Sequence, residues 1–226
     1  MIEKAPKVVR LTVVRPGAIL AFVAALPIAA GISFAAAPRA SRDSLWRLAI
    51  TSQDRARLRN WREAWVLGLE QARAAGEGDT IAREGVLLDP DAGLENPALP
   101  DGDYACRTIK LGHKTAGQLA YVAYPAFRCR MAGDRFVKLS GSQRPEGHVW
   151  PFDPLRMIFL GAMALGDEPR ALDYGRDADR DMLGVVERIG PKRWRLVLPQ
   201  PTWESQIDVV ELVPVAAGAS PPAGGA

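Results

Sequence analysis

Two stretches of sequence decide the fold: Tyr104-Ala-Cys-Arg-Thr-Ile-Lys-Leu111 and Tyr121-Val-Ala-Tyr-Pro-Ala-Phe-Arg-Cys-Arg-Met131. Each carries one of the two cysteines of the chain. Both segments are rich in residues that favour β-strands, and Gly117 between them marks a turn. In a regular hairpin about that turn, Cys106 would lie directly opposite Cys129, at a separation that a disulfide can span. We therefore predict an antiparallel hairpin with a Cys106–Cys129 disulfide.

Further short segments of strand-like composition continue this pattern to the C-terminal side, with turn residues between most of them. Gly190-Pro-Lys192 is the clearest hairpin turn. We expect about seven to eight antiparallel strands that form a small closed or nearly closed barrel, or a sandwich, over residues 102–214. The predicted strands are residues 103–112, 120–131, 135–141, 155–165, 182–189, 193–199 and 206–213.

The chain before the barrel has a helical pattern over residues 43–88. Thr51 and Asp54 have the spacing of a capping box, and apolar residues then recur every three or four positions, Trp61 and Trp65 among them. The two tryptophans are interpreted as anchors against the sheet rather than ligand-stacking groups. We predict an α+β protein in which an N-terminal helical segment and Pro-rich linker, residues 38–101, precede the barrel. Residues 215–226 are predicted to form a disordered tail.

The first 37 residues resemble an export signal. Basic residues end at Arg15, and an uncharged run that ends in small residues follows it. Cleavage after Ala35 or Ala37 would fit the preference for small residues, whereas Pro27 and the Ala-rich composition argue against an uncleaved anchor. Residues 1–37 are therefore a predicted signal peptide, with a signal anchor as the alternative. Either reading places the rest of the chain outside the cytoplasm, where paired cysteines form disulfides.

Composition excludes several classes of protein. The chain has 226 residues, 48% of them hydrophobic and 24% charged, which suits an ordinary globular domain. Its net charge of +3 comes from the first 37 residues, and residues 38–226 are formally neutral. A nucleic-acid partner is therefore not expected, because that function needs basic charge gathered on the folded domain.

Arginines dominate the outward face of the predicted hairpin. Arg107 would lie opposite Arg128, with Arg130 one pair further along, and like charges that face each other destabilise a sheet. Pairing with acids such as Glu146, Asp153 or Glu204 is the simpler explanation. The functional alternative is a ligand-binding site for an anion, joined by Arg144, because arginine binds carboxylates and phosphates bidentately.

No sequence motif identifies a reaction or a cofactor. Ser140, Ser142 and His148 are the candidates for a hydrolase, but no nucleophile motif surrounds either serine. Asp177, Asp179 and Asp181 begin like a calcium loop, which then lacks the glycine at its sixth position and the glutamate at its twelfth. We predict no catalytic residues, no metal site and no cofactor.

Several segments spread over the chain form a recognisable set. They include Trp46-Arg-Leu-Ala-Ile-Thr-Ser-Gln-Asp-Arg-Ala-Arg-Leu58, Trp61-Arg-Glu-Ala-Trp65, Gly141-Ser-Gln-Arg144, Arg156-Met-Ile-Phe-Leu-Gly161, Asp181-Met-Leu-Gly-Val-Val-Glu-Arg-Ile-Gly190 and Trp194-Arg-Leu-Val-Leu-Pro199. Together these segments resemble an exported alphaproteobacterial family of unknown function, DUF4893. The resemblance covers residues 44–214, nearly the whole chain after the signal, and it implies export and a shared fold. It supplies no catalytic residues.

These observations predict a periplasmic or secreted binding protein of the cell envelope rather than an enzyme. A small molecule or an envelope protein would bind at the barrel mouth or at the arginine-bearing face, and an inhibitor is one form of this function. The alternative is a periplasmic hydrolase that uses Ser140, Ser142 and His148 together with the acids of residues 173–181. A membrane partner is expected only if the N-terminal segment stays uncleaved.

Overall fold

The computed structural model describes residues 42–215, and the side chains of residues 45–215. The predicted signal segment and the tail beyond Val215 lie outside the described residues. The helices and the barrel belong to one compact unit. The helices are α1 (Arg42–Ala49), α2 (Ser52–Arg59), α3 (Trp61–Ala74) and α4 (Gly78–Glu84), followed by a 3-10 turn at Gly85–Leu87.

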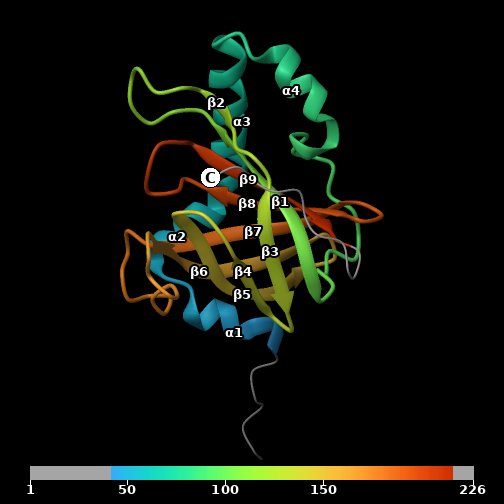
Figure 1. The fold of residues 1–226 in the computed structure, drawn as a ribbon, viewed down its shortest axis with the longest axis vertical. Coiled ribbons are helices and arrows are strands. Elements are labelled where there is room, and N and C mark those ends of the chain that lie inside the picture. The colour runs from blue at the N-terminus through green and yellow to red at the C-terminus, as the bar shows by residue number, and fades with distance from the viewer. Residues whose placement is uncertain (1–41, 216–226) are drawn as a thin grey trace, which may run out of the picture. The chain divides into compact units, whose positions relative to one another are not determined.

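Eight antiparallel strands close into a barrel, and a ninth short strand pairs with the last residues of the first barrel strand (Figure 1). Neighbouring strands pair in the order β1, β3, β4, β5, β6, β7, β8, β9, and β9 pairs with β1 to complete the closure. The strands are β1 (Gly102–Leu111), β2 (Tyr121–Ala123), β3 (Phe127–Ala132), β4 (Arg135–Lys138), β5 (Gln143–Asp153), β6 (Arg156–Leu165), β7 (Asp181–Gly190), β8 (Arg193–Pro199) and β9 (Ile207–Pro214). The α+β class and the antiparallel barrel are thus confirmed, as is the hairpin turn between β7 and β8.

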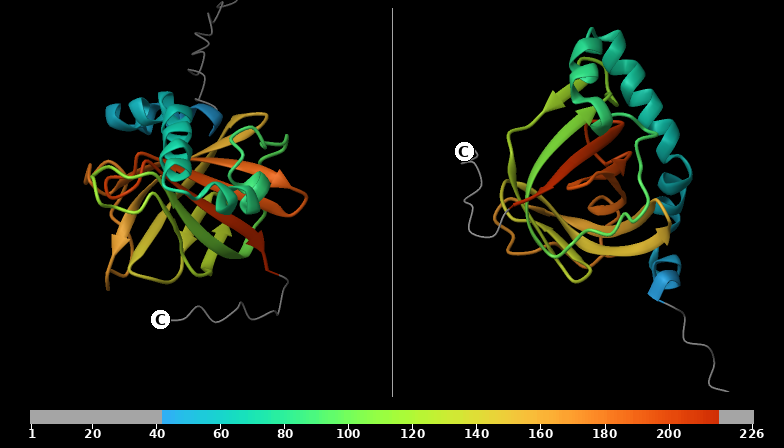
Figure 2. Two further views of the ribbon diagram at one scale, coloured as in Figure 1. Left: turned by 90° about the horizontal axis from the view of Figure 1, so that it is seen from above. Right: turned by 90° about the vertical axis from the view of Figure 1, so that its right-hand side faces the viewer.

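The core of the protein lies in two layers, one inside the barrel and one outside it. Inside, Tyr104, Phe136 and Phe159 pack with the cystine. Outside, the helices lie together on one side of the barrel and bury an apolar layer against it (Figure 2). Trp61 and Trp65 belong to this outer layer, which confirms that they anchor the helices to the sheet.

Helix α2 begins as its sequence indicates, and helix α3 packs closely against the barrel. The side chain of Thr51 accepts a hydrogen bond of 3.2 Å from the backbone N–H of Asp54, so the predicted N-cap is present. Helix α3 approaches β1 closely at Gly68: a methyl group added there would lie 3.1 Å from the carbonyl oxygen of Leu111. A glycine at this point therefore lets the helix backbone come close to the barrel.

Strand β5 was not predicted. Its Pro145 and Pro151 argue against a strand, because proline cannot donate a hydrogen bond to a neighbouring strand. In the structure β4 pairs only with residues 146–148 of β5, so both prolines lie outside that paired stretch. The prediction of a single strand over residues 120–131 was also wrong, because the chain leaves β1 around Pro125 and divides into β2 and β3.

The predicted face of the cysteine hairpin is confirmed, but its register was wrong by two residues. Cys106 lies opposite Phe127, and Cys129 lies opposite Tyr104. A shift of two residues keeps every side chain on its face, so both cysteines still point into the barrel. Their Cα atoms lie 6.1 Å apart across the diagonal, and the disulfide is formed.

Candidate functional site

A cavity of about 580 Å³ opens at the end of the barrel where β1 and β4 finish and β3 and β9 begin. Its lining combines apolar side chains with hydroxyl, ammonium and carboxylate groups. The apolar lining includes Phe127, Phe136, Met163, Met182, Leu198 and Val210, and Cys129 of the disulfide also contributes. The polar lining includes Thr108, Lys110, Lys138, Ser140, Ser142, Glu204 and Asp208.

Strand alternation places two lysines in this cavity. On β1 the side chain of Lys110 follows the face of Cys106 and Thr108, and on β4 that of Lys138 follows the face of buried Phe136. Inward positions on a barrel of this size are normally apolar, so two inward lysines at one mouth are unusual.

Lys110 is neutralised by acids of the cavity. Asp208 lies opposite it on β9, with 3.5 Å between Nζ and Oδ2, and Glu204 Oε2 lies 2.7 Å from the same nitrogen. Burial acts against the charge of Lys110, but the two carboxylates prevail and raise its pKa above the usual value. Burial raises the pKa of Asp208, although Lys110 and the hydroxyl of Ser205 act in the opposite direction.

Lys138 has no such neutralisation. Its Nζ lies 4.0 Å from the centre of the Phe127 ring, and no carboxylate of residues 45–215 forms an ion pair with it. Burial lowers the pKa of Lys138 to about 8, the charges of Lys110 and Arg144 act in the same direction, and the charge of Asp208 opposes them only in part. A negatively charged group beside this ammonium would replace the solvation that the cavity removes.

Arg107 does not face Arg128, as the predicted register required. It lies opposite Glu211 on β9, and its Nε donates to that carboxylate at 3.1 Å. Glu84 of α4 binds its other nitrogens bidentately, at 2.8 Å and 2.6 Å. Internal pairing is thus confirmed for Arg107, but with acids other than those named from the sequence.

The other three arginines also have partners within the protein. Arg128 and Arg130 lie opposite Ala105 and Asp103, and both donate to the Asp103 carboxylate. Arg130 lowers the pKa of Asp103 through these hydrogen bonds, and Arg128 adds to the effect. Arg144 donates to backbone carbonyls of the loops after β4 and β6, so it braces the rim of the cavity. An anion-binding role for the four arginines stays a prediction, and they do not form one cluster.

The hydrolase candidates are not brought together. Ser140 and Ser142 line the cavity, whereas the side chain of His148 is 53% exposed on β5. Its Nδ1 lies 3.1 Å from Asp134 Oδ1, and none of the hydrogen bonds among residues 45–215 joins it to either serine. The described residues contain no cluster of three or more potential metal ligands.

Sequence reasoning missed the two cavity lysines, although a signal for each was present. Thr108 was assigned to the face of the cysteines, and Lys110 is two residues further along the same strand. Phe136 and Lys138 have the same spacing on β4. A charged residue on the core-facing side of a strand marks either a buried ion pair or a candidate binding site. Lys110 forms such an ion pair, whereas Lys138 does not within residues 45–215.

None of the helices within residues 42–215 has the length and apolar character that crossing a membrane requires. No curated protein and no solved structure matches this chain. A family model does match, and it covers residues 46–212, from within α1 to within β9. Helices and barrel are therefore parts of one family domain. The chain belongs to the family described as domain of unknown function DUF4893.

Proposed function

We propose that this protein is an exported, non-catalytic binding protein of the cell envelope that takes one small amphipathic anion into the open end of its barrel. The observation that carries the proposal is Lys138, a lysine inside a largely apolar cavity without a carboxylate partner among the described residues. A charge in that position costs free energy in the empty protein, and a ligand anion would recover it.

The shape of the cavity supports a ligand with one apolar end. Its volume falls within the usual range for small-molecule sites, about 300–1,000 Å³. Phe136, Met182 and Leu198 line the cavity and are almost fully buried, so the apolar end would lie among them. The hydroxyls of Ser140 and Ser142 stand on the loop after Lys138, where they can donate to the charged end.

Export is supported by the signal-like residues 1–37 and by the disulfide. A cystine is stable in the periplasm or outside the cell, whereas the cytoplasm keeps thiols reduced. The proposed location is therefore the periplasm or the medium.

Dodecanoate is the first ligand to test, with dodecanol as its neutral counterpart. We expect the protein to bind dodecanoate, and Lys138→Met to weaken that binding by about 10- to 100-fold, since hydrogen bonds to charged groups contribute about 1.5–3 kcal/mol. Dodecanol binding should stay equal or become tighter, because methionine adds apolar surface. Isothermal titration calorimetry measures both affinities.

Lys192→Met is the matched control, because Lys192 is exposed in the turn between β7 and β8. It should bind dodecanoate as the unsubstituted protein does. Lys138→Met should unfold at an equal or higher urea concentration, since it removes a lysine whose charge is penalised by burial. A folded Lys138→Met variant with unchanged affinity for dodecanoate, or no binding by the unsubstituted protein, would refute the proposal.

The affinity for dodecanoate is expected to fall as the pH rises through about 8. Lys138 has a pKa of about 8 in the free protein, and a bound carboxylate would raise it by favouring the ammonium form. Binding is therefore strongest below that pH and declines until the pKa of the complex is reached. Lys110 stays charged in this range because its pKa is raised.

Titrations from about pH 6 to about pH 10 would test this dependence, since dodecanoate itself is ionised throughout. The groups that face Lys138 are Lys110 on β1, Arg144 on β5 and Asp208 on β9. In Lys138→Met the slope should disappear. A slope that persists in this variant would assign the titration to one of those neighbours instead.

A further inference from the structure

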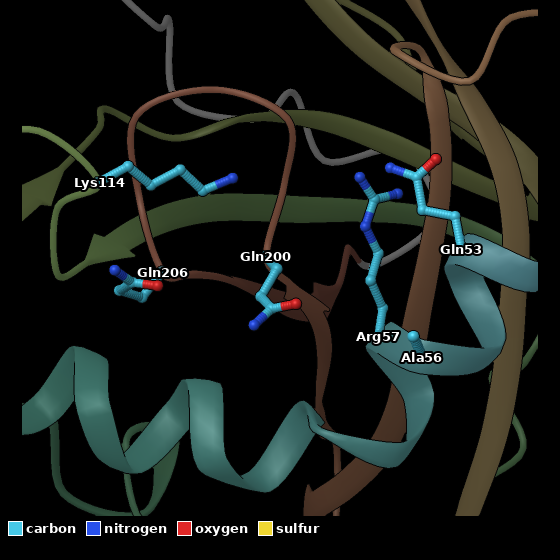
Figure 3. A pocket seen from close by; sticks show the side chains of 6 residues that line it. All are labelled: Gln53, Ala56, Arg57, Lys114, Gln200 and Gln206. Carbon is cyan, nitrogen blue, oxygen red and sulfur yellow. The ribbon is translucent and has the colours of Figure 1, made fainter.

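A second hollow, of about 320 Å³, lies between α2 and the loops that follow β1 and β8. It shares no lining residue with the barrel cavity. Figure 3 shows the side chains around it, which come from Gln53, Ala56, Arg57, Lys114, Gln200 and Gln206. Two of these six residues carry a positive charge, three end in carboxamides, and none carries a carboxylate.

Arg57 presents a free edge to the hollow. The residue is buried, and its Nη1 donates to Asp54 Oδ1 at 2.9 Å and to the carbonyl oxygen of Asp181 at 3.1 Å. Within residues 45–215 no acceptor is bound to its Nε or Nη2. These are the two nitrogens of one side of the guanidinium, and such a side can hold a carboxylate through two parallel hydrogen bonds.

Lys114 extends toward Arg57 from the opposite side of the hollow (Figure 3). Its ammonium donates to the carbonyl oxygen of Pro201, which leaves further N–H groups available. Burial lowers the pKa of Lys114, the charge of Arg57 lowers it further, and Asp208 opposes both. An anion bound between the two side chains would favour the ammonium form of Lys114, which burial and Arg57 disfavour.

The glutamines add neutral donors and acceptors around this pair of cations. Gln206 uses its Nε2 to donate to the carbonyl oxygen of His113, so its Oε1 remains available as an acceptor. The side chains of Gln53 and Gln200 make no hydrogen bond to any described residue. Carboxamides both donate and accept, which suits hydroxyl groups on a ligand.

We propose that this hollow binds a small hydroxylated carboxylate, such as a sugar acid, independently of the ligand of the barrel cavity. The carboxylate lies between Arg57 and Lys114, and the hydroxyls contact the glutamines. The volume of the hollow suits a ligand with a single compact ring, because it lies at the lower end of the range of volumes of small-molecule sites.

Glucuronate is the probe, and glucose is its neutral counterpart. Calorimetry on the unsubstituted protein should show saturable binding of glucuronate, with no binding of glucose at about 10 mM. Lys114→Met should weaken glucuronate binding by at least about tenfold. Lys192→Met and Lys138→Met should leave it unchanged, and Lys114→Met should still bind dodecanoate, so that failure at one site is distinguishable from failure at the other.

Gln53→Ala tests the glutamines separately, at an exposed position where loss of folding is not expected. It should weaken glucuronate binding and leave the weaker binding of inorganic phosphate unchanged. No saturable glucuronate binding, or equal binding by Lys114→Met, would overturn the site. Phosphate and glucuronate bound equally, with no effect of Gln53→Ala, would overturn the ligand class.

Discussion

Replacing Arg195 with methionine is expected to lower the free energy of unfolding by about 3–5 kcal/mol. Arg195 is fully buried on β8, and its Nε donates to Glu187 Oε2 at 2.8 Å. Its Nη1 donates to the carbonyl oxygens of Leu87 and Asp89, at 3.0 Å and 2.6 Å, and the guanidinium lies 4.4 Å from the Trp65 ring centre. One side chain thus joins the barrel wall to the helical layer. Its loss would leave a buried carboxylate without its partner and would remove a donor from the carbonyl oxygens of Val86 and Leu87.

Urea denaturation followed by circular dichroism measures this effect. The matched control is Arg135→Met, because Arg135 also pairs with a glutamate, Glu146, but is exposed. Arg135 itself is largely solvated, and Glu146 keeps a second partner in the backbone N–H of Ala171, so the control should lose much less than Arg195→Met. Arg195→Lys should lose an intermediate amount, since an ammonium lacks the planar fork that reaches acceptors on two sides. If Arg195→Met and Arg135→Met have the same stability, Arg195 does not hold the helices to the barrel.

Removing the disulfide by the double substitution Cys106→Ala/Cys129→Ala is expected to cost about 3 kcal/mol of unfolding free energy. The cross-link spans 23 residues of sequence, so it restricts the unfolded chain, and both sulfurs are buried in the barrel core. Reduction of the unsubstituted protein with dithiothreitol should lower its stability by a similar amount.

The double variant provides the control for reduction, because dithiothreitol should have no effect on it. Dodecanoate binding by the variant reports on the cavity, since Cys129 lines it beside Phe127. If the reduced protein is as stable as the oxidised one, the disulfide does not stabilise the barrel, and its role would have to lie elsewhere.

The candidate site illustrates which parts of a barrel follow from local sequence. Alternation along β1 predicted that Cys106 and Thr108 share an inward face, and the structure confirms that face. The same alternation would have placed Lys110 and Lys138 inside, had it been applied to them. Local sequence does not determine whether an inward lysine has an acidic partner, because Asp208, the partner of Lys110, lies on β9, nearly a hundred residues away.

The ion-pair partners of the arginines could not be predicted from the hairpin register alone. A regular hairpin about Gly117 placed Arg107 against Arg128, but in the structure Arg128 lies opposite Ala105, two residues away from the predicted pairing. Closure of the barrel then places Glu211 beside Arg107, and α4 adds Glu84 from the helical layer. Both partners depend on contacts made only when the whole domain is folded.

The sequence by itself determined the class of this protein: helices followed by a small antiparallel barrel, two cysteines on one inward face, and a family domain over almost the whole described chain. Those features follow from residue periodicity, caps and turns, which act over a few residues. Only the tertiary structure decided the register, the pairing of the arginines and the positions of both hollows. These depend on closure between β1 and β9 and on helices packed against the barrel, so residues about a hundred positions apart must meet before the charges find their partners.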